Sequence, residues 1–273
     1  MIVDLHSHST ASDGTLSATE VLLRAAQAGV DVLAITDHDT VAGIMTLDPA
    51  LTSTLTLVPG VELSALWGTV GIHIVGVNVH LDSSEFQDAL ASQQRARYQR
   101  AGIIAEKLEK KGFPDMLTQV ALVAGGASIG RPHFAQQLVT MGAVRSTDEA
   151  FRKYLGTGKL GDVKQLWAPL TQVVSWICNA GGTAVLAHPD KYHLSRTRLL
   201  ALVDDFKAAG GAAIEVVSGQ QTAAKTRDLA TLCAQQGLLA SCGSDFHQPG
   251  QSWAELGKHA TLPEGCTPIW DRW

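Results

Sequence analysis

Residues 2–9 read Ile2-Val3-Asp4-Leu5-His6-Ser7-His8-Ser9, an apolar strand that runs directly into two histidines. His6 and His8 stand two positions apart, so the alternation of an extended chain points both imidazoles to the same side of a sheet. Short, apolar and β-branched runs of the same kind recur at residues 32–35, 55–58, 72–79, 183–187, 213–217 and 238–242. Together with residues 2–5, these runs predict a sheet of seven strands.

Helix-like segments follow several of these strands, at residues 17–28, 170–180, 198–209 and 223–236. Strands that alternate with helices favour parallel pairing and an α/β fold. Seven strands suit a closed or distorted barrel, in which the carboxyl ends of parallel strands gather on one face. We therefore predict an α/β barrel with its site at the strand ends.

The alternation of strands and helices breaks between residues 85 and 166, which read as mostly helical over 86–111 and 133–154. We interpret residues 85–166 as a helical insertion that caps the mouth of a barrel made of residues 1–84 and 167–273. Basic residues give the first helical segment a charged face, which we interpret as solvated: Arg95, Arg97, Arg100, Lys107, Lys110 and Lys111.

The composition limits the classes of protein to which the chain can belong. Its formal net charge of −5 argues against non-specific coating of nucleic acid, although it leaves room for one cationic pocket. No apolar run is long enough to cross a membrane, and the first residues lack the pattern of a signal peptide. The four cysteines form no CxxC pair, which favours free thiols in a reducing compartment. We expect a cytoplasmic protein with no membrane contact and no obligate protein partner.

Further candidate metal ligands fall in or just after the later strands: His38, Glu62, His73, His188, Asp245 and His247. Imidazoles and carboxylates without thiolates favour Mn²⁺, Zn²⁺ or Fe²⁺ over Ca²⁺ or Mg²⁺. The candidates exceed what one ion can use, so we expect two or three ions, with a carboxylate such as Glu62 shared between two of them. Asp4, Asp37 and Asp39 are expected to orient ligating histidines or to cap loops.

Several motifs resemble those of the PHP (polymerase and histidinol phosphatase) family. They are Asp4-Leu5-His6-Ser7-His8-Ser9, Ser12-Asp13-Gly14, Thr36-Asp37-His38-Asp39, Gly60-Val61-Glu62, Ala187-His188-Pro189 and Gly243-Ser244-Asp245-Phe246-His247. The resemblance covers nearly the whole chain. It implies a TIM-like, distorted (β/α)7 barrel with a trinuclear metal centre at the carboxyl ends of the strands.

The resemblance also implies which residues bind each ion. One ion would lie among His6, His8, Glu62 and Asp245, a second among Glu62, His73 and His188, and a third among Asp13, His38 and His247. Some members of the family carry histidine where Asp13 stands here. Because a carboxylate is a harder ligand than imidazole, we expect Mn²⁺, with Zn²⁺ and Fe²⁺ as alternatives.

Three further stretches resemble a bacterial PHP subgroup that includes a 3′,5′-nucleotide bisphosphate phosphatase and a 5′→3′ exoribonuclease. They are Gly130-Arg131-Pro132-His133-Phe134-Ala135, Phe151-Arg152-Lys153-Tyr154-Leu155 and Lys191-Tyr192-His193-Leu194-Ser195-Arg196. One departure is Pro189-Asp190-Lys191, where relatives often carry a small residue after the proline. That departure affects a local substrate contact and leaves the metal motifs unchanged.

We therefore predict a phosphoric ester hydrolase in which a metal-activated hydroxide attacks phosphorus in line with the leaving oxygen. The predicted substrates are nucleoside 3′,5′-bisphosphates, converted to 5′-monophosphates, and short RNA or DNA strands with a 5′ phosphate. Asp245, His247 and Arg131 are the predicted catalytic residues, and either His247 or a metal-bound water is expected to protonate the leaving group. The predicted phosphate contacts are Arg131, His133, Arg196 and Ser244. Arg131 and His133 are the best anchors among them, and Arg196 and Arg198, after the strand that ends at His188, are weaker candidates.

Three alternatives share parts of this pattern. A histidinol-phosphate phosphatase would use the same metal centre with a pocket for a small cationic amine. An amidohydrolase would also hold metals at barrel strand ends, but it has no need for a phosphate-binding arginine. A non-catalytic PHP module would lack turnover altogether, whereas the set of candidate ligands here is complete.

Overall fold

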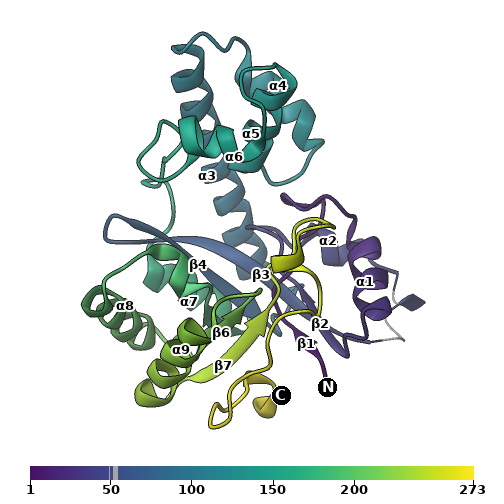
Figure 1. The fold of residues 1–273 in the computed structure, drawn as a ribbon, viewed down its shortest axis with the longest axis vertical. Coiled ribbons are helices and arrows are strands. Elements are labelled where there is room, and N and C mark those ends of the chain that lie inside the picture. The colour runs from purple at the N-terminus through teal and green to yellow at the C-terminus, as the bar shows by residue number, and fades with distance from the viewer. Residues whose placement is uncertain (49, 52–54) are drawn as a thin grey trace.

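The computed structural model describes residues 1–48, 50–51 and 55–273, and its centre is a sheet of seven strands that curves into a barrel (Figure 1). The strands are hydrogen-bonded neighbours in chain order. Their bounds are β1 (Val3–Asp4), β2 (Val32–Ile35), β3 (Thr56–Trp67), β4 (Val70–Val77), β5 (Thr183–Leu186), β6 (Ala213–Ser218) and β7 (Leu239–Gly243). Each of the seven predicted runs therefore forms a strand.

The barrel closes where the last strand meets the first. The Leu5 N–H donates to the Cys242 carbonyl over 3.0 Å, and Ser7 pairs in parallel with Phe246. A Cβ atom on Gly243 would lie only 2.4 Å from His6 Cβ. Glycine at this position therefore lets the end of β7 lie directly against the first histidine. The predicted distorted seven-stranded barrel is confirmed.

Strand β4 departs from the predicted parallel pairing, because it runs antiparallel to both β3 and β5. Residues Trp67 and Val70 pair across a two-residue turn at Gly68 and Thr69. Gly68 has a φ of +57°, which glycine adopts without the steric cost that a Cβ would bring. As a result no helix separates β3 from β4, and His73 lies inside a strand and not at its carboxyl end.

Helices α1 (Ala18–Gln27), α2 (Ala42–Met45), α7 (Leu170–Asn179), α8 (Arg196–Ala208) and α9 (Ala223–Gln236) pack around the barrel. Figure 1 shows α7, α8 and α9 on one side and α1 and α2 on the other. The start of α1 is fixed by a capping box between Ser17 and Glu20. Its residues Val21 and Leu22 are fully buried. The helical segments predicted at residues 17–28, 170–180, 198–209 and 223–236 are all present.

The region between β4 and α7 forms a separate helical lobe above the barrel (Figure 1). Its elements are α3 (Ser84–Glu109), α4 (Met116–Ala124), α5 (Arg131–Thr140), α6 (Thr147–Ala150) and the π-helical turn η2 (Phe151–Leu155). Leu108, Phe134 and Leu138 belong to a hydrophobic cluster of its own, distinct from the barrel core. The predicted helical character of this region is therefore correct. The domain boundaries at 84/85 and 166/167 stay predictions.

Across the part of the chain that the structure describes, no helix is both long and apolar enough to pass through a lipid bilayer.

Candidate metal and phosphate site

Glu62 lies at the centre of the site and is fully buried. Its two carboxylate oxygens face five imidazoles. The nitrogen–oxygen distances are 3.3 Å to His6 Nε2, 3.3 Å to His8 Nε2, 2.9 Å to His38 Nδ1, 2.8 Å to His73 Nδ1 and 2.9 Å to His188 Nε2. Residues from β1, β2, β3, β4 and β5, or from the segments that follow them, therefore converge on one carboxylate. Such a carboxylate is well placed to be shared between ions.

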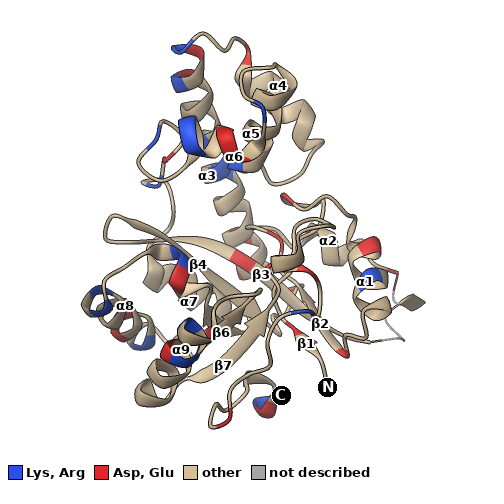
Figure 2. Ribbon diagram, viewed as in Figure 1, with Lys and Arg blue, Asp and Glu red and all other residues tan. Residues whose placement is uncertain are grey.

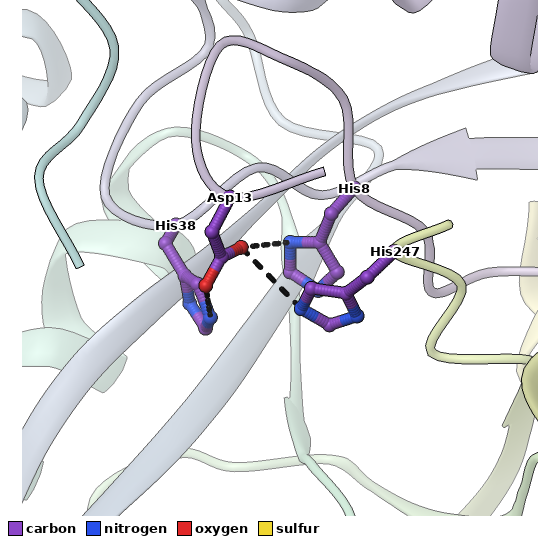
Figure 3. Close-up of side chains that lie close together, drawn as sticks. All are labelled: His8, Asp13, His38 and His247. Carbon is purple, nitrogen blue, oxygen red and sulfur yellow. Dashed lines mark ion pairs between the residues drawn. The ribbon is translucent and has the colours of Figure 1, made fainter. Parts of the chain in front are cut away.

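Asp13 is the carboxylate of a neighbouring group formed with three histidines (Figure 3). Its Oδ2 lies 3.6 Å from His38 Nε2, and its Oδ1 lies 3.3 Å from His247 Nε2. The Nδ1 atom of His8 lies 4.0 Å from Asp13 Oδ1. The loop after β1, the loop after β2 and the segment after β7 supply these side chains, which gather from distant parts of the sequence.

Asp245 forms the third carboxylate of the site. Its Oδ1 lies 3.5 Å from His6 Nε2 and 3.4 Å from His8 Nε2. Its Oδ2 forms an ion pair with Lys191. All nine predicted metal ligands are therefore brought together. The groups differ in detail from those that the family resemblance implies, since His188 groups with His6 and Glu62, and His73 groups with His38 and Glu62.

The donor atoms of this cluster fit divalent metal ions. Several buried atoms make no hydrogen bond with the described residues: His6 Nε2, His8 Nδ1 and Nε2, and His188 Nδ1. Unpaired buried polar atoms are rare in proteins because each one loses its contacts with water. Imidazole nitrogens and carboxylate oxygens whose donor atoms lie within 4.8 Å of one another are suitable ligands for such ions.

Charges within the cluster shift the pKa values of its members in opposite directions. Burial lowers the pKa of His247, but Asp13 and Asp245 outweigh it and raise that pKa to about 9. Burial and the neighbouring His247 lower the pKa of His8 to about 3. Burial likewise lowers the pKa of His73 to about 4, although Glu62 opposes it. The centre therefore contains both charged and neutral imidazoles.

The three carboxylates of the centre are ionised. Burial alone would raise their pKa values, but nearby cationic groups lower them well below the ordinary range. His38 has the largest such effect on Asp13 and on Glu62, and Lys191 has the largest on Asp245. A buried site that holds three negative carboxylates is suited to cations.

Glu215 is a member of the site that the sequence analysis missed. Its Oε1 lies 3.0 Å from His6 Nδ1, and its Oε2 accepts a 2.6 Å hydrogen bond from the His188 backbone N–H. An acidic acceptor on the far side of a ligating imidazole fixes the orientation of the ring. The signal was present in the sequence, because Glu215 is a single acid inside the apolar run of β6.

Asp37 and Asp4, two of the three aspartates expected to orient histidines or cap loops, take the second of these roles. Asp37 accepts hydrogen bonds of 2.7 Å from the Ser9 backbone N–H and from the hydroxyls of Ser9 and Ser12. Asp4 accepts from the backbone N–H groups of Ser244 and Gly257, over 2.8 and 3.0 Å. These contacts hold the ligand-bearing loops against one another.

The backbone is strained at two of the candidate ligands. His188 has a φ of +26° and Asp245 a φ of +55°. A positive φ is energetically unfavourable for any residue other than glycine, and residues in this conformation cluster at functional sites. Both positions come two residues after the end of a strand, and both side chains belong to the metal-ligand groups.

A pocket of about 560 Å³ joins the metal-ligand cluster to a group of arginines. Arg97 and Arg100 of α3 and Arg131 of α5 line it together with His38, His73 and other residues of the centre. We call it the arginine pocket. Figure 2 shows Lys and Arg on α3 and next to α6, in the lobe that faces the barrel. The structure thus places the helical lobe over the candidate metal centre.

The prediction of a solvated basic face over residues 86–111 is wrong for two of its six basic residues. Arg97 is 5% exposed and Arg100 is 7% exposed. Arg97 Nε donates to Asp39 Oδ2 over 2.5 Å, and Arg100 Nε donates to the Val163 carbonyl over 2.7 Å. Both guanidinium groups also lie over the Trp167 ring, at 5.3 and 5.1 Å from its centroid.

The arginines of this pocket repel one another. Burial and the charges of Arg131 and Arg97 lower the pKa of Arg100 to about 9. Burial lowers the pKa of Arg131, with a further contribution from Arg97. Arg131 donates to the Leu155 carbonyl over 3.2 Å, and its guanidinium lies 5.9 Å from the Phe151 ring centroid. A phosphate bound among these groups would relieve the repulsion and accept their hydrogen bonds.

The other predicted phosphate contacts lie in different surroundings. His133 accepts a hydrogen bond from the Gly130 N–H on Nδ1, and burial lowers its pKa. Ser244 is buried and its hydroxyl donates to the His6 carbonyl over 3.4 Å. Arg196 begins α8, is exposed and does not line the arginine pocket, and the Arg198 guanidinium lies over the Trp67 ring. The structure therefore gives Arg196 no support as a phosphate contact.

The comparisons with known proteins agree with this geometry. Residues 4–101 match the PHP domain. The 5′→3′ exoribonuclease Rnm of Escherichia coli is 43% identical to the chain, over 100% of the chain and 94% of that protein. The chain belongs to the PHP family. A 3′,5′-nucleoside bisphosphate phosphatase of Chromobacterium violaceum is 40% identical over 98% of the chain and 95% of that protein.

Solved structures of the same shape include two with clear sequence similarity to this PHP protein. One is described as an amidohydrolase from Chromobacterium violaceum with bound sulfate and no metal, with a TM-score of 0.92 and 39% identity, covering 100% of this chain and 95% of that one. Another is described as a putative metal-dependent phosphoesterase from Bifidobacterium adolescentis. It has a TM-score of 0.79 and 26% identity, and the match covers 98% of this chain and 92% of that one. The predicted family and fold are confirmed.

Proposed function

We propose that this PHP-family phosphoesterase hydrolyses a phosphate ester next to a 5′ phosphate that it holds in place. Its substrates would be nucleoside 3′,5′-bisphosphates and short RNA strands with a 5′ phosphate, the latter degraded in the 5′→3′ direction. The observation that carries the proposal is the single pocket lined both by the histidine–carboxylate cluster and by Arg97, Arg100 and Arg131. One end of this pocket suits metal ions, and the other suits an anion.

Two or three divalent ions would occupy the cluster, and Mn²⁺ is the proposed metal. The proposed sets are His6, His8, Glu62 and Asp245 for one ion, Glu62, His73 and His188 for a second, and Asp13, His38 and His247 for a third. When bound, such ions supply an activated water and neutralise charge on the phosphoryl oxygens. Buried ligand atoms without hydrogen bonds support this assignment.

The chain's own residues would bind and orient the substrate. Arg131 would hold the 5′ phosphate, with Arg97 and Arg100 adding positive potential around it. Lys191 lies at the edge of the centre, with its ammonium on Asp245, where it would face the reacting phosphate. Holding one phosphate in place puts the neighbouring phosphorus at a fixed position relative to the cluster, which lowers the entropic cost of reaction.

Both proposed substrates would react at the same bond. Water adds to phosphorus, the bond between phosphorus and the 3′ oxygen breaks, and the 3′ oxygen takes a proton. A nucleoside 3′,5′-bisphosphate would then yield a 5′-monophosphate and inorganic phosphate. An RNA strand would yield the same kind of 5′-monophosphate and a remainder that carries a new 5′ phosphate, so the reaction can repeat.

The named relatives support this choice over the alternatives. The two described above are an exoribonuclease and a bisphosphate phosphatase, and the related structure described as an amidohydrolase binds sulfate, an anion similar to phosphate. Three arginines in one pocket also disfavour histidinol phosphate, whose amine is cationic. We further propose a cytoplasmic location. The proposal is supported by the described cysteines Cys178, Cys233, Cys242 and Cys266, which are all free thiols.

A panel of four substrates tests the proposal, with Mn²⁺, Zn²⁺ and Mg²⁺ added separately. The panel contains adenosine 3′,5′-bisphosphate, an RNA dinucleotide with a 5′ phosphate, the same dinucleotide with a 5′ hydroxyl, and histidinol phosphate. We expect turnover of the first two, highest with Mn²⁺, and slow turnover of the others. Equal rates with and without the 5′ phosphate, or preference for histidinol phosphate, would overturn the proposal.

A further inference from the structure

A second pocket, of about 400 Å³, opens beside the candidate metal centre. It shares His188, Lys191, Asp245 and His247 with the arginine pocket. The rest of its lining comes from Asp190 and Ser244, from residues 218–222 at the end of β6 and just after it, from Lys225 in the first turn of α9, and from Gln251, Trp253 and Ala254 after β7. The two pockets therefore meet at the centre and diverge from it. We call this one the tryptophan pocket, after Trp253.

The side chains of the tryptophan pocket suit a nucleoside. Trp253 is 60% exposed, so its indole is available for stacking. The hydroxyl oxygen of Ser218 is buried and makes no hydrogen bond with the described residues. Gln220 and Gln251 add amide groups to the lining. Aromatic rings that stack on bases, together with amides that reach base edges, are the usual means by which proteins bind single-stranded RNA.

The cationic groups of this pocket lie at two places. Lys191 is on the side shared with the centre, with its ammonium on Asp245. Lys225 is at the first turn of α9, where its Nζ lies 2.5 Å from Asp190 Oδ2. Lys225 is about half exposed, so its ion pair is open to exchange for a phosphate group. A nucleotide between the two lysines would have a phosphate near each end.

We propose that the tryptophan pocket binds the nucleotide that follows the reacting phosphate in an RNA substrate. This inference rests on the proposed function and adds a second subsite to it. If the first nucleotide and its 5′ phosphate lie in the arginine pocket, the reacting phosphate lies at the four shared residues. The strand continues through the 5′ oxygen of that phosphate, away from the arginines. The tryptophan pocket is where it can continue.

The assignment separates the two proposed substrates. In a nucleoside 3′,5′-bisphosphate the reacting phosphate carries no further nucleoside, so the tryptophan pocket is not used. In an RNA dinucleotide the second nucleoside fills it. After the bond between phosphorus and the 3′ oxygen breaks, the second nucleotide stays in this pocket with its new 5′ phosphate still at the centre.

Replacing Trp253 tests the assignment, because its side chain is largely exposed and its loss should leave the fold intact. We expect Trp253→Ala to lower kcat/KM for a dinucleotide with a 5′ phosphate about tenfold or more, as the loss of one base stack implies. For adenosine 3′,5′-bisphosphate we expect kcat/KM to change by less than about twofold, because this substrate has no second base to stack on Trp253. Trp273→Ala is the matched control, since Trp273 is 43% exposed and lies in neither pocket lining.

A binding measurement gives a second readout that does not depend on turnover. With a chelator present, a dinucleotide with a 5′ phosphate should quench tryptophan fluorescence in the wild type and in Trp273→Ala. The affinity of Trp253→Ala for the dinucleotide should be lower than that of the wild type by about tenfold or more. Equal affinity of the wild type and Trp253→Ala for the dinucleotide would overturn the assignment of the tryptophan pocket. An equal fall in kcat/KM for both substrates would also overturn it. A wild type that cleaves the bisphosphate but no RNA overturns this subsite alone, whereas one that cleaves neither overturns the proposed function as well.

Discussion

The histidine–carboxylate centre and the arginines of the helical lobe line one pocket, but they are built in different ways. The residues of the centre lie in barrel strands or in the segments that follow them, and Glu62 alone faces five of their imidazoles. Arg97, Arg100 and Arg131 come from two helices of an insertion that has its own hydrophobic core. The difference indicates that the barrel supplies the chemistry, while the insertion selects the substrate.

Replacing Glu62 tests this division between chemistry and substrate selection most strongly. We expect Glu62→Gln to lower kcat about a thousandfold for every phosphoester, since the charge that gathers the ions is worth several kcal/mol. Binding of a nucleoside 5′-monophosphate in the arginine pocket should persist. Steady-state kinetics and equilibrium dialysis measure the two effects, with Glu264→Gln as an exposed acidic control. A variant that retains a tenth or more of wild-type activity contradicts the central place given to Glu62.

Arg131 tests the other half of the comparison. We expect Arg131→Ala to lower kcat/KM about ten- to a hundredfold for substrates with a 5′ phosphate, because a hydrogen bond to a charged group contributes about 1.5–3 kcal/mol. For substrates with a 5′ hydroxyl, kcat/KM should fall only slightly. Arg131→Lys should be intermediate, and Arg196→Ala, which removes an exposed arginine outside both pocket linings, is the control. An equal loss for both classes of substrate would place Arg131 in the chemistry instead.

Glu215 tests whether the centre depends on the residue that orients His6. We expect Glu215→Gln to weaken Mn²⁺ binding about tenfold, as is usual when the acceptor behind a ligating histidine is lost. Specificity for the 5′ phosphate should be unchanged, because Glu215 belongs to the barrel. Calorimetric titration measures the affinity, with Glu106→Gln on the exposed face of α3 as the control. Unchanged affinity would show that His6 needs no such support.

Proton release gives the smallest predicted effect. In the metal-free protein the raised pKa of His247, about 9, leaves that imidazole charged at neutral pH, whereas His8 and His73, at about 3 and 4, are neutral. A ligating imidazole must be neutral, so metal binding should displace the His247 proton and weaken as pH falls. Calorimetry in two buffers of different ionisation enthalpy should show that His247→Asn releases about one proton fewer. The same release in both proteins would exclude His247 as a ligand.

The candidate ligands could be predicted because histidines are informative where they follow strands. His6 and His8 follow an apolar run whose period points both to one side, Asp245 comes just after another such run, and the structure gathers all three. The direction of β4 could not be predicted from those runs. Its only local signal is the turn at Gly68, which the alternation of strands and helices outweighed.

The arginines were harder to predict, because an exposed and a buried basic residue follow the same helical spacing. Arg95 is exposed and Arg97 is buried on the same helix, and only the packing of the lobe against the barrel separates them. Trp253 lies in a short segment with no periodic pattern, so its place beside the centre depends on tertiary structure alone. The ligands in or just after the barrel strands were therefore predictable, and so was Arg131 through its motif, whereas Arg97, Arg100 and Trp253 were not predicted as pocket residues.

The most direct measurement is a crystal structure of the chain grown with Mn²⁺ and a nucleoside 5′-monophosphate, with the ions located by anomalous scattering. The account predicts manganese among the ligands grouped around Glu62, Asp13 and Asp245, and the 5′ phosphate against Arg131. Manganese absent from these groups, or a 5′ phosphate bound away from the arginine pocket, would contradict it.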